Sequence, residues 1–240
     1  PDGCIYFCTG GRGTSGGIYA IRYQPSGEKP KQPDLGEGIA KAIRQPQLYS
    51  AWGRQSVAIM KRDMRDEWEE QIAGVAFSPD NPARYRIRAL DLMQLLGPVP
   101  TPDLLIDLSR SPNEALRVKT AQLLALHPND ELALRRLNDM LGDSSTLVRQ
   151  AAAEGLLRCE QTVSVDRLIP LLESNERTLA FTANRLLQLH SQAVRDGLIQ
   201  RHDQPRLMIH AALASMIAGP TYEQAIAATQ ALLKIPQGYV

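Results

Sequence analysis

The sequence has few aromatic residues and no excess of charge of either sign. Only 5% of its 240 residues are aromatic, whereas Leu and Ala recur throughout the second half. This balance favours close helix packing over a β-sandwich or barrel. The 27 basic and 26 acidic residues nearly cancel, so no net attraction to nucleic acid or anionic lipid is built in. No apolar run is long enough to cross a bilayer, and we expect no membrane insertion by this chain.

Cysteine and histidine are also scarce. Cys4, Cys8 and Cys159 form an odd, sparse set that cannot be a disulfide framework. The sequence lacks a Cys-x-x-Cys pair for zinc, a Cys-x-x-Cys-His haem attachment motif and a His-Glu-x-x-His motif. We find no nucleophile with a nearby base among four scattered histidines. We therefore predict no catalytic residue, no metal and no cofactor, and hence that this chain is not an enzyme.

The N-terminal segment 1–24 differs in kind from the rest of the chain. Two β-favouring runs, at 4–8 and 18–23, flank a Gly-rich stretch at 10–17, which predicts a β-hairpin over positions 1–24. The Gly-rich stretch lacks the Gly-Lys-Ser/Thr ending of a phosphate loop. Two lone strands have unpaired edges, so we expect the hairpin to pack on the first helices or to pair with another chain, for example in a dimer.

A proline-rich segment follows the hairpin. Three prolines at positions 25–33 disfavour helix and central strand, so the segment 25–34 is predicted to be a linker. The chain begins with Pro1 instead of Met, and we expect it to be a processed or excised piece of a longer protein.

From residue 35 onward the spacing of apolar residues becomes helical, and turn clusters separate short helices. Arginines recur at a nearly constant interval, as Arg54, Arg86, Arg117 and Arg149. A repeat of this length indicates stacked helix pairs. The sequence therefore predicts a mainly α chain, an α-α superhelix of about six helix pairs over positions 35–240, with a short N-terminal β-hairpin.

Acidic residues accompany two of these arginines. Asp80 and Asp143 each stand six positions before an arginine, Arg86 and Arg149. An Asp in the turn between two helices, followed by an Arg in the second helix, resembles the ladder of HEAT repeats, which implies a HEAT-like solenoid. We predict a structural ladder of Arg54, Asp80, Arg86, Arg117, Asp143 and Arg149. A basic stripe for phosphate backbones is the competing interpretation of such spacing.

The order of parts resembles a larger bacterial family. The opening Pro-Asp-Gly-Cys-Ile-Tyr-Phe-Cys-Thr-Gly-Gly is similar to the element that starts a blade strand in propellers of the glucose/sorbosone dehydrogenase type. Followed by a Pro-rich linker and short HEAT-like repeats, it resembles membrane-bound dehydrogenase-like proteins that run from a propeller through HEAT-like repeats to a cytochrome c domain. The resemblance implies a place in the bacterial cell envelope or periplasm. It transfers no catalytic residue to this sequence, which holds only one hairpin of the propeller and no haem motif.

These features predict a non-catalytic module that binds a protein partner or spaces adjacent domains of the same polypeptide. The candidate partner surface consists of polar residues of the second helices, Arg88, Lys119, Gln150 and Glu154.

The alternative is a nucleic-acid-binding solenoid similar to DNA-repair glycosylases. Such a protein needs aromatic side chains near its basic residues, and this chain has two tryptophans, Trp52 and Trp68. The densest basic cluster contains Arg54, Lys61, Arg62, Arg65, Arg84, Arg86 and Arg88.

Overall fold

A computed structural model describes residues 4–11, 13, 15–22, 34–201 and 203–235 of the chain. Contacts divide the chain into two units, Pro1–Gly36 and Glu37–Val240, and we consider each by itself. The predicted linker at 25–34 lies outside the described residues, except for Asp34.

The first unit contains a two-stranded antiparallel hairpin, as predicted. Strand β1 (Cys4–Thr9) pairs with β2 (Gly17–Arg22), with Cys4 opposite Arg22 and Thr9 opposite Gly17. Phe7 and Tyr19 face each other across the strands, and their rings stack with centroids 5.3 Å apart. A side chain at Gly16 would collide with the Thr9 carbonyl oxygen, which explains a glycine immediately before the second strand.

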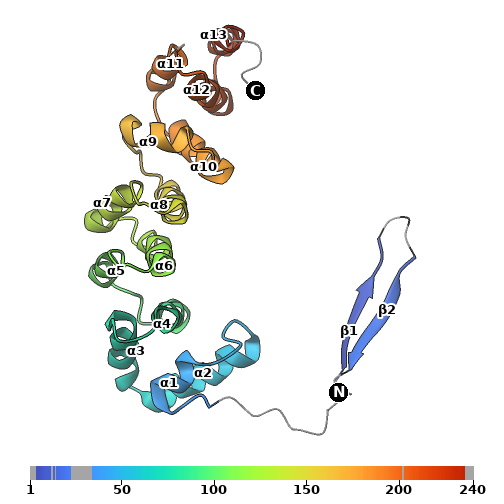
Figure 1. Ribbon diagram of the computed structural model, residues 1–240, viewed down its shortest axis with the longest axis vertical. Coiled ribbons are helices and arrows are strands. Elements are labelled where there is room, and N and C mark those ends of the chain that lie inside the picture. Colours follow the sequence, from blue (N-terminus) through green and yellow to red (C-terminus); the bar gives the residue numbers. More distant parts are fainter. Residues whose placement is uncertain (1–3, 12, 14, 23–33, 202, 236–240) are drawn as a thin grey trace. The chain divides into compact units, whose positions relative to one another are not determined.

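All of the regular secondary structure described in the second unit is α-helical (Figure 1). Its described residues form thirteen helices joined by short turns. The helices are α1 (Gly38–Ile43), α2 (Ala51–Met64), α3 (Glu67–Phe77), α4 (Ala83–Leu96), α5 (Pro102–Leu108), α6 (Glu114–Leu124), α7 (Glu131–Met140), α8 (Thr146–Arg158), α9 (Val165–Leu172), α10 (Arg177–Gln188), α11 (Gln192–Ile199), α12 (Pro205–Ile217) and α13 (Tyr222–Leu232).

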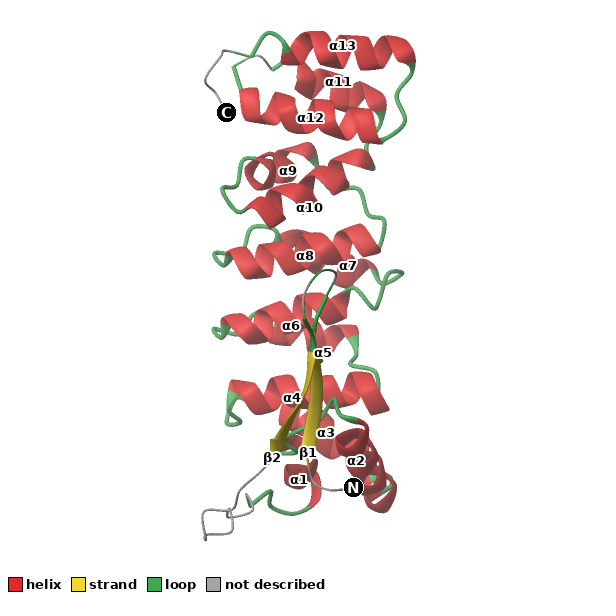
Figure 2. Cartoon of the chain, turned by 90° about the vertical axis from the view of Figure 1, so that its right-hand side faces the viewer, coloured by secondary structure: helices red, strands yellow, loops and turns green. Residues whose placement is uncertain are grey.

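The helices pack as pairs that stack in chain order. Each odd-numbered helix from α3 to α11 packs against the even-numbered helix that follows it. The second helices of these pairs, α4, α6, α8, α10 and α12, also pack on one another in sequence, and Figure 2 shows them side by side. The unit is therefore an α-α superhelix, a HEAT-like solenoid, and the predicted fold class is confirmed.

The turns and the interior both follow from the residue types. Asn113, Asp130 and Ser145 each begin a helix by accepting a hydrogen bond from a backbone N–H of its first turn.

Between neighbouring second helices the side chains are small, and a Cβ at Gly155 of α8 would lie 3.2 Å from the Cβ of Ala125. Alanine and glycine at these contacts let the helices approach closely, while buried leucines fill the space between pairs.

The first pair departs from this pattern. Helix α1 packs against α4, whereas α2 packs against α1 and α3 and reaches α4 through a hydrogen bond from Lys61 to the Leu96 carbonyl oxygen. Gly53 of α2 permits a close approach to the Gln47 carbonyl group, which a side chain there would overlap. The Ser50 side chain caps α2 by accepting a 2.9 Å hydrogen bond from the Gly53 N–H. By these helix contacts, α2 does not continue the row of second helices that starts at α4.

Candidate interaction surface

The periodic arginine is the fourth residue of each second helix that carries it. Arg117 and Arg149 reach back to the turn before their own helix, and Arg86 reaches back to the end of the helix before it. Arg86 donates hydrogen bonds from Nε to the Ala76 carbonyl oxygen at 2.9 Å and from Nη2 to that of Phe77 at 3.0 Å. Burial lowers the pKa of Arg86 below its usual value. The guanidinium thus satisfies two carbonyl groups at the end of α3 that have no partner within that helix.

Arg117 joins two successive repeats. Its Nη1 donates to the Ser111 carbonyl oxygen at 3.0 Å, which lies in the turn before its own helix. Its Nε and Nη2 donate to the two carboxylate oxygens of Asp143, each at 2.9 Å. Arg149 in turn donates to the backbone carbonyl oxygen of Asp143 at 2.8 Å. The turn before α8 is therefore held by an arginine from each of two neighbouring helices.

The Arg117–Asp143 pair is also largely shielded from water. The two side chains are 14% and 12% exposed. Burial acts to raise the pKa of Asp143, but hydrogen bonds from Arg117 and from the Ser145 N–H outweigh it and hold that pKa below its ordinary value. The hydrogen bond to Asp143 raises the pKa of Arg117. Both groups are therefore charged at neutral pH, and the bidentate geometry is the strong form of such a pair.

Two members of the predicted ladder are placed differently. Arg54 is exposed, and its side chain makes no hydrogen bond with another residue in the described part of the chain. The reason is that α2 lies outside the row of second helices. Asp80 is exposed, and its contact in the turn is a 3.3 Å hydrogen bond from its own N–H to Ser78. Arg86 is consequently held by carbonyl groups instead of a carboxylate.

The last two second helices, α10 and α12, lack the arginine. Their fourth residues are Ala180 and Met208, and both are buried. Arg206, near the start of α12, reaches the turn between α9 and α10 in the previous pair. It donates to the Glu173 carbonyl oxygen at 3.0 Å and to Asn175 Oδ1 at 3.1 Å. Sequence reasoning missed Arg206 because it does not stand at the periodic position.

A second set of arginines links the first helices. Arg136 of α7 donates from Nε to the Ser109 side chain at 2.6 Å and from Nη2 to the Ser109 carbonyl oxygen at 3.1 Å. Arg167 of α9 donates to the Asn138 carbonyl oxygen at 2.7 Å. The interval from Arg136 to Arg167 equals that from Arg86 to Arg117, and this spacing could have revealed them.

The two arginines at matched positions provide a direct test of these contacts. We expect Arg86→Ala to lower the free energy of unfolding by about 1–2 kcal/mol, because two carbonyl groups at the end of α3 lose their charged donor. Arg54→Ala removes the same side chain from the same helix position and should change stability by less than about 0.5 kcal/mol. Urea titrations followed by circular dichroism measure both. Equal effects of the two substitutions would contradict the role assigned to Arg86.

Polar side chains also connect neighbouring second helices. Lys119 of α6 forms an ion pair with Asp91 of α4, with Nζ 2.8 Å from Oδ1. Gln150 of α8 donates from Nε2 to Thr182 Oγ1 of α10 at 2.9 Å and to Glu154 Oε1 at 2.6 Å. These contacts hold the row of second helices in register and fix the orientation of the side chains that line its surface.

A groove runs over these helices, and we call it the second-helix groove. Its volume is about 830 Å³, and its walls come from α4, α6, α8 and α10. It is lined by Gln94, Lys119, Gln122, Leu123, Leu126, Gln150, Glu154, Leu157, Arg158, Arg177, Thr178, Phe181, Thr182 and Arg185.

The structure brings three of the four predicted partner-surface residues together. Lys119, Gln150 and Glu154 all line the second-helix groove. Arg88 lines a separate hollow of about 480 Å³ between α4 and the turn before α2, together with Tyr49 and Asp91. Burial and a hydrogen bond with Asp91 raise the pKa of Tyr49 in that hollow.

The groove combines apolar and basic chemistry. Phe181 is 61% exposed and Leu126 is 42% exposed, so both offer apolar surface to a partner. Arg158, Arg177 and Arg185 also line it. Sequence reasoning missed Phe181 and these three arginines. The spacing Arg177, Phe181 and Arg185, every fourth position on one helix face, is the pattern that could have found them.

Several of the residues considered for nucleic-acid binding are buried or make hydrogen bonds within the chain. Trp68 is fully buried and donates from Nε1 to the Gly97 carbonyl oxygen at 2.8 Å. Trp52 is 60% exposed. Lys61 donates to the Leu96 carbonyl oxygen, and Arg86 binds the end of α3. Trp68, Lys61 and Arg86 are therefore committed to intramolecular contacts.

The residues that the structure describes contain neither a cluster of metal ligands nor a membrane-spanning helix. Within them, no three His, Cys, Asp or Glu side chains lie close enough together to hold a metal ion. No helix of this part of the chain has the length and apolar character that a membrane span requires.

Comparison with known families identifies one segment of the array. Residues 101–188 match the model of HEAT repeats, and this range covers α5 to α10. No curated protein matches the chain. The matched range contains Arg117, Asp143 and Arg149 as well as nearly the whole second-helix groove. Residues 101–188 are therefore a HEAT-like repeat region within a helical solenoid.

Proposed function

We propose that this chain is a non-catalytic module that binds a protein through the second-helix groove. HEAT repeats commonly mediate contacts between proteins, and their solenoids are typically non-catalytic. The observation that carries the proposal is the exposure of Phe181 and Leu126 in a groove lined by charged side chains. Exposed apolar side chains surrounded by polar ones are typical of protein interfaces.

The same groove favours protein over nucleic acid as the partner. A phosphate backbone requires basic side chains and gains nothing from an acidic one, yet Glu154 lies in the lining. Of the two tryptophans considered for stacking on bases, Trp68 is fully buried and neither one lines the groove. A mixed surface of this kind suits the side chains of a protein.

The affinity of the groove for a protein can be tested by capture from a nuclease-treated extract of the source organism. We expect the doubly substituted L126D/F181D chain to retain at least about tenfold less of the bound protein than the unaltered chain, because a carboxylate would replace each apolar contact. Leu132→Asp is the matched control, because Leu132 of α7 is 53% exposed on a first helix. It should leave capture unchanged.

Two results would contradict the proposed function. One is retention from a matching untreated extract that is absent from the nuclease-treated extract, which would indicate nucleic acid. The other is a loss of capture with Leu132→Asp while L126D/F181D captures normally. Circular dichroism of each variant establishes that the helices are intact.

We further propose that the module belongs to a larger dehydrogenase-like protein of the bacterial cell envelope, in which adjacent domains are among its partners. The support is the order of a β-hairpin, a Pro-rich segment and HEAT-like repeats, which resembles that family. An antibody against the chain should detect a polypeptide much larger than 26.5 kDa in the envelope fraction. A band of 26.5 kDa confined to the cytosol would contradict it.

Dimerisation through the hairpin is a separate proposal. Ile5 and Ile18 are 68% and 77% exposed, and β1 and β2 pair with each other in a sheet of two strands. A second copy could extend this sheet through a strand edge. Light scattering should then give twice the monomer mass for the full chain and the monomer mass after removal of the segment 1–24. A monomeric full chain would contradict this proposal.

A further inference from the structure

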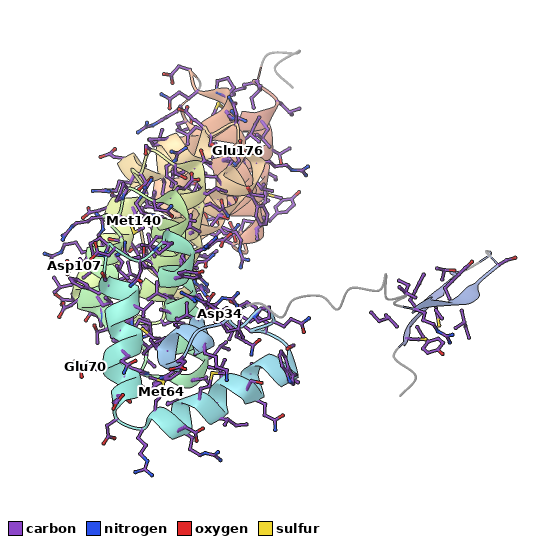
Figure 3. All side chains as sticks on the ribbon, turned by 60° about the horizontal axis from the view of Figure 1, so that its bottom comes forward. Asp34, Met64, Glu70, Asp107, Met140 and Glu176 are labelled. Atoms are coloured by element: carbon purple, nitrogen blue, oxygen red, sulfur yellow. The ribbon has the colours of Figure 1, made fainter. Side chains whose placement is uncertain are left out.

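We infer that the second-helix groove recognises an extended acidic segment of a partner protein, in which two carboxylates flank an apolar side chain. This inference rests on the proposed function and names the chemistry of the partner. It is carried by Arg177, Phe181 and Arg185, which α10 presents along one face of the groove. Figure 3 labels Glu176, the residue immediately before α10.

The two arginines of α10 are free to bind a ligand. Arg177 and Arg185 are exposed, and neither side chain makes a hydrogen bond or ion pair with any other residue that the structure describes. This distinguishes them from Arg86, Arg117 and Arg149, whose guanidinium groups are occupied by turn groups. Their donors are therefore available for carboxylates, which guanidinium groups bind in a bidentate manner.

The charges of the groove favour an acidic partner. The lining contains the basic residues Lys119, Arg158, Arg177 and Arg185 and one acidic residue, Glu154. Lys119 is already paired with Asp91, and Glu154 accepts a hydrogen bond from Gln150. Because Gln150 is neutral, the charges without an opposite partner are those of three arginines and of Glu154, and the groove keeps an excess of positive charge. Such a potential attracts carboxylates and repels basic segments.

The spacing on α10 sets the spacing expected in the ligand. Residues four apart on a helix lie about 6 Å apart, so Arg177 and Arg185 are about 12 Å apart with Phe181 between them. An extended peptide advances about 3.3 Å per residue and places alternate side chains on the same side. Two carboxylates at the first and fifth positions of such a peptide are thus about 13 Å apart, and the residue midway between them faces Phe181. The expected pattern is acidic-x-apolar-x-acidic, aligned with α10.

The test uses random peptides displayed on phage and selected against the immobilised full chain. We expect selection to enrich the acidic-x-apolar-x-acidic pattern. A selected peptide should bind the R177E/R185E chain about 100-fold more weakly, since two charge-assisted contacts become repulsive. Phe181→Ala should weaken binding about tenfold. Fluorescence anisotropy of the labelled peptide gives each dissociation constant.

The matched control is R135E/R201E, which reverses two exposed arginines outside the groove. It should change the affinity less than about twofold if the effect is local and not one of net charge. The inference is overturned if the enriched peptides lack acidic residues, if no peptide is enriched, or if the control weakens binding as much as R177E/R185E. It is also overturned if single-stranded DNA binds the groove and displaces the peptide.

These results separate the inference from the proposed function. If L126D/F181D abolishes capture of a partner protein while the peptide result is negative, the groove binds a protein of other chemistry and only the inference fails. If capture is unaffected by L126D/F181D as well, the proposed function fails with it.

Discussion

Replacing Asp143 by alanine should lower the free energy of unfolding by about 2–3 kcal/mol, measured by urea titration. The Asp143 carboxylate receives two hydrogen bonds from Arg117 at 2.9 Å and one from the Ser145 N–H at 2.8 Å. Its removal leaves the guanidinium of Arg117 without its acidic partner at a side-chain exposure of 14%. The contact between α6 and the turn before α8 is then weakened.

A nearby exposed pair provides the control for this prediction. Asp139 lies 3.4 Å from Arg167, with side-chain exposures of 51% and 45% for Asp139 and Arg167. Because water screens such a pair, Asp139→Ala should cost less than about 0.5 kcal/mol. If Asp143→Ala were no more destabilising than Asp139→Ala, the Arg117–Asp143 contact would not stabilise the stack.

The effect of Asp143 should also depend on pH. The pKa of this carboxyl is lowered in the folded chain from its ordinary value of 3.8. A group with a lowered pKa adds stability above its ordinary pKa and loses that contribution as the pH falls through the folded value. The stability difference between the unaltered chain and Asp143→Asn should therefore be constant at neutral pH and shrink below about pH 4. A difference that grows on acidification would contradict the assigned ion pair.

Replacing Trp68 by alanine should have the largest effect on stability, about 3–5 kcal/mol. The Trp68 side chain is fully buried at the start of α3, and its indole N–H donates to the Gly97 carbonyl oxygen at 2.8 Å. Truncation leaves a cavity and an unpaired carbonyl group. Trp68→Phe keeps most of the packing and should cost less than Trp68→Ala, although it also leaves that carbonyl group unpaired.

Trp52→Ala is the control for Trp68, because Trp52 is 60% exposed near the start of α2. It should alter stability by less than about 0.5 kcal/mol in the same thermal and urea titrations. A small effect of Trp68→Ala would mean that this side chain is not part of the core, and the argument against its stacking on nucleic-acid bases would fall.

Much of the fold could be predicted from local patterns. The nearly constant interval between Arg54, Arg86, Arg117 and Arg149 indicated stacked helix pairs, because similar pairs must repeat the same contacts. The β-favouring runs on either side of a Gly-rich stretch predicted the hairpin that β1 and β2 form. These patterns succeed because their causes lie within one repeat or one hairpin.

Features that depend on how repeats are stacked could not be predicted in this way. Arg54 has the periodic position but not the contacts, since α2 lies outside the row of second helices. Arg206 has the contacts but not the position. The second-helix groove brings together residues from four helices, and nothing in the spacing along one helix shows which neighbouring side chains line it. Lys119 illustrates this, because its partner Asp91 belongs to the previous repeat.

The central claim is that this chain binds a protein through the second-helix groove, and site-specific photocrosslinking tests it most directly. A photoreactive phenylalanine analogue at position 181 of the full chain, irradiated in an extract of the source organism, should crosslink a protein at an acidic segment. The same analogue at position 132, on a first helix, should crosslink little of that protein. Crosslinking from position 132 but not from position 181, or crosslinking of position 181 to nucleic acid, would contradict the claim.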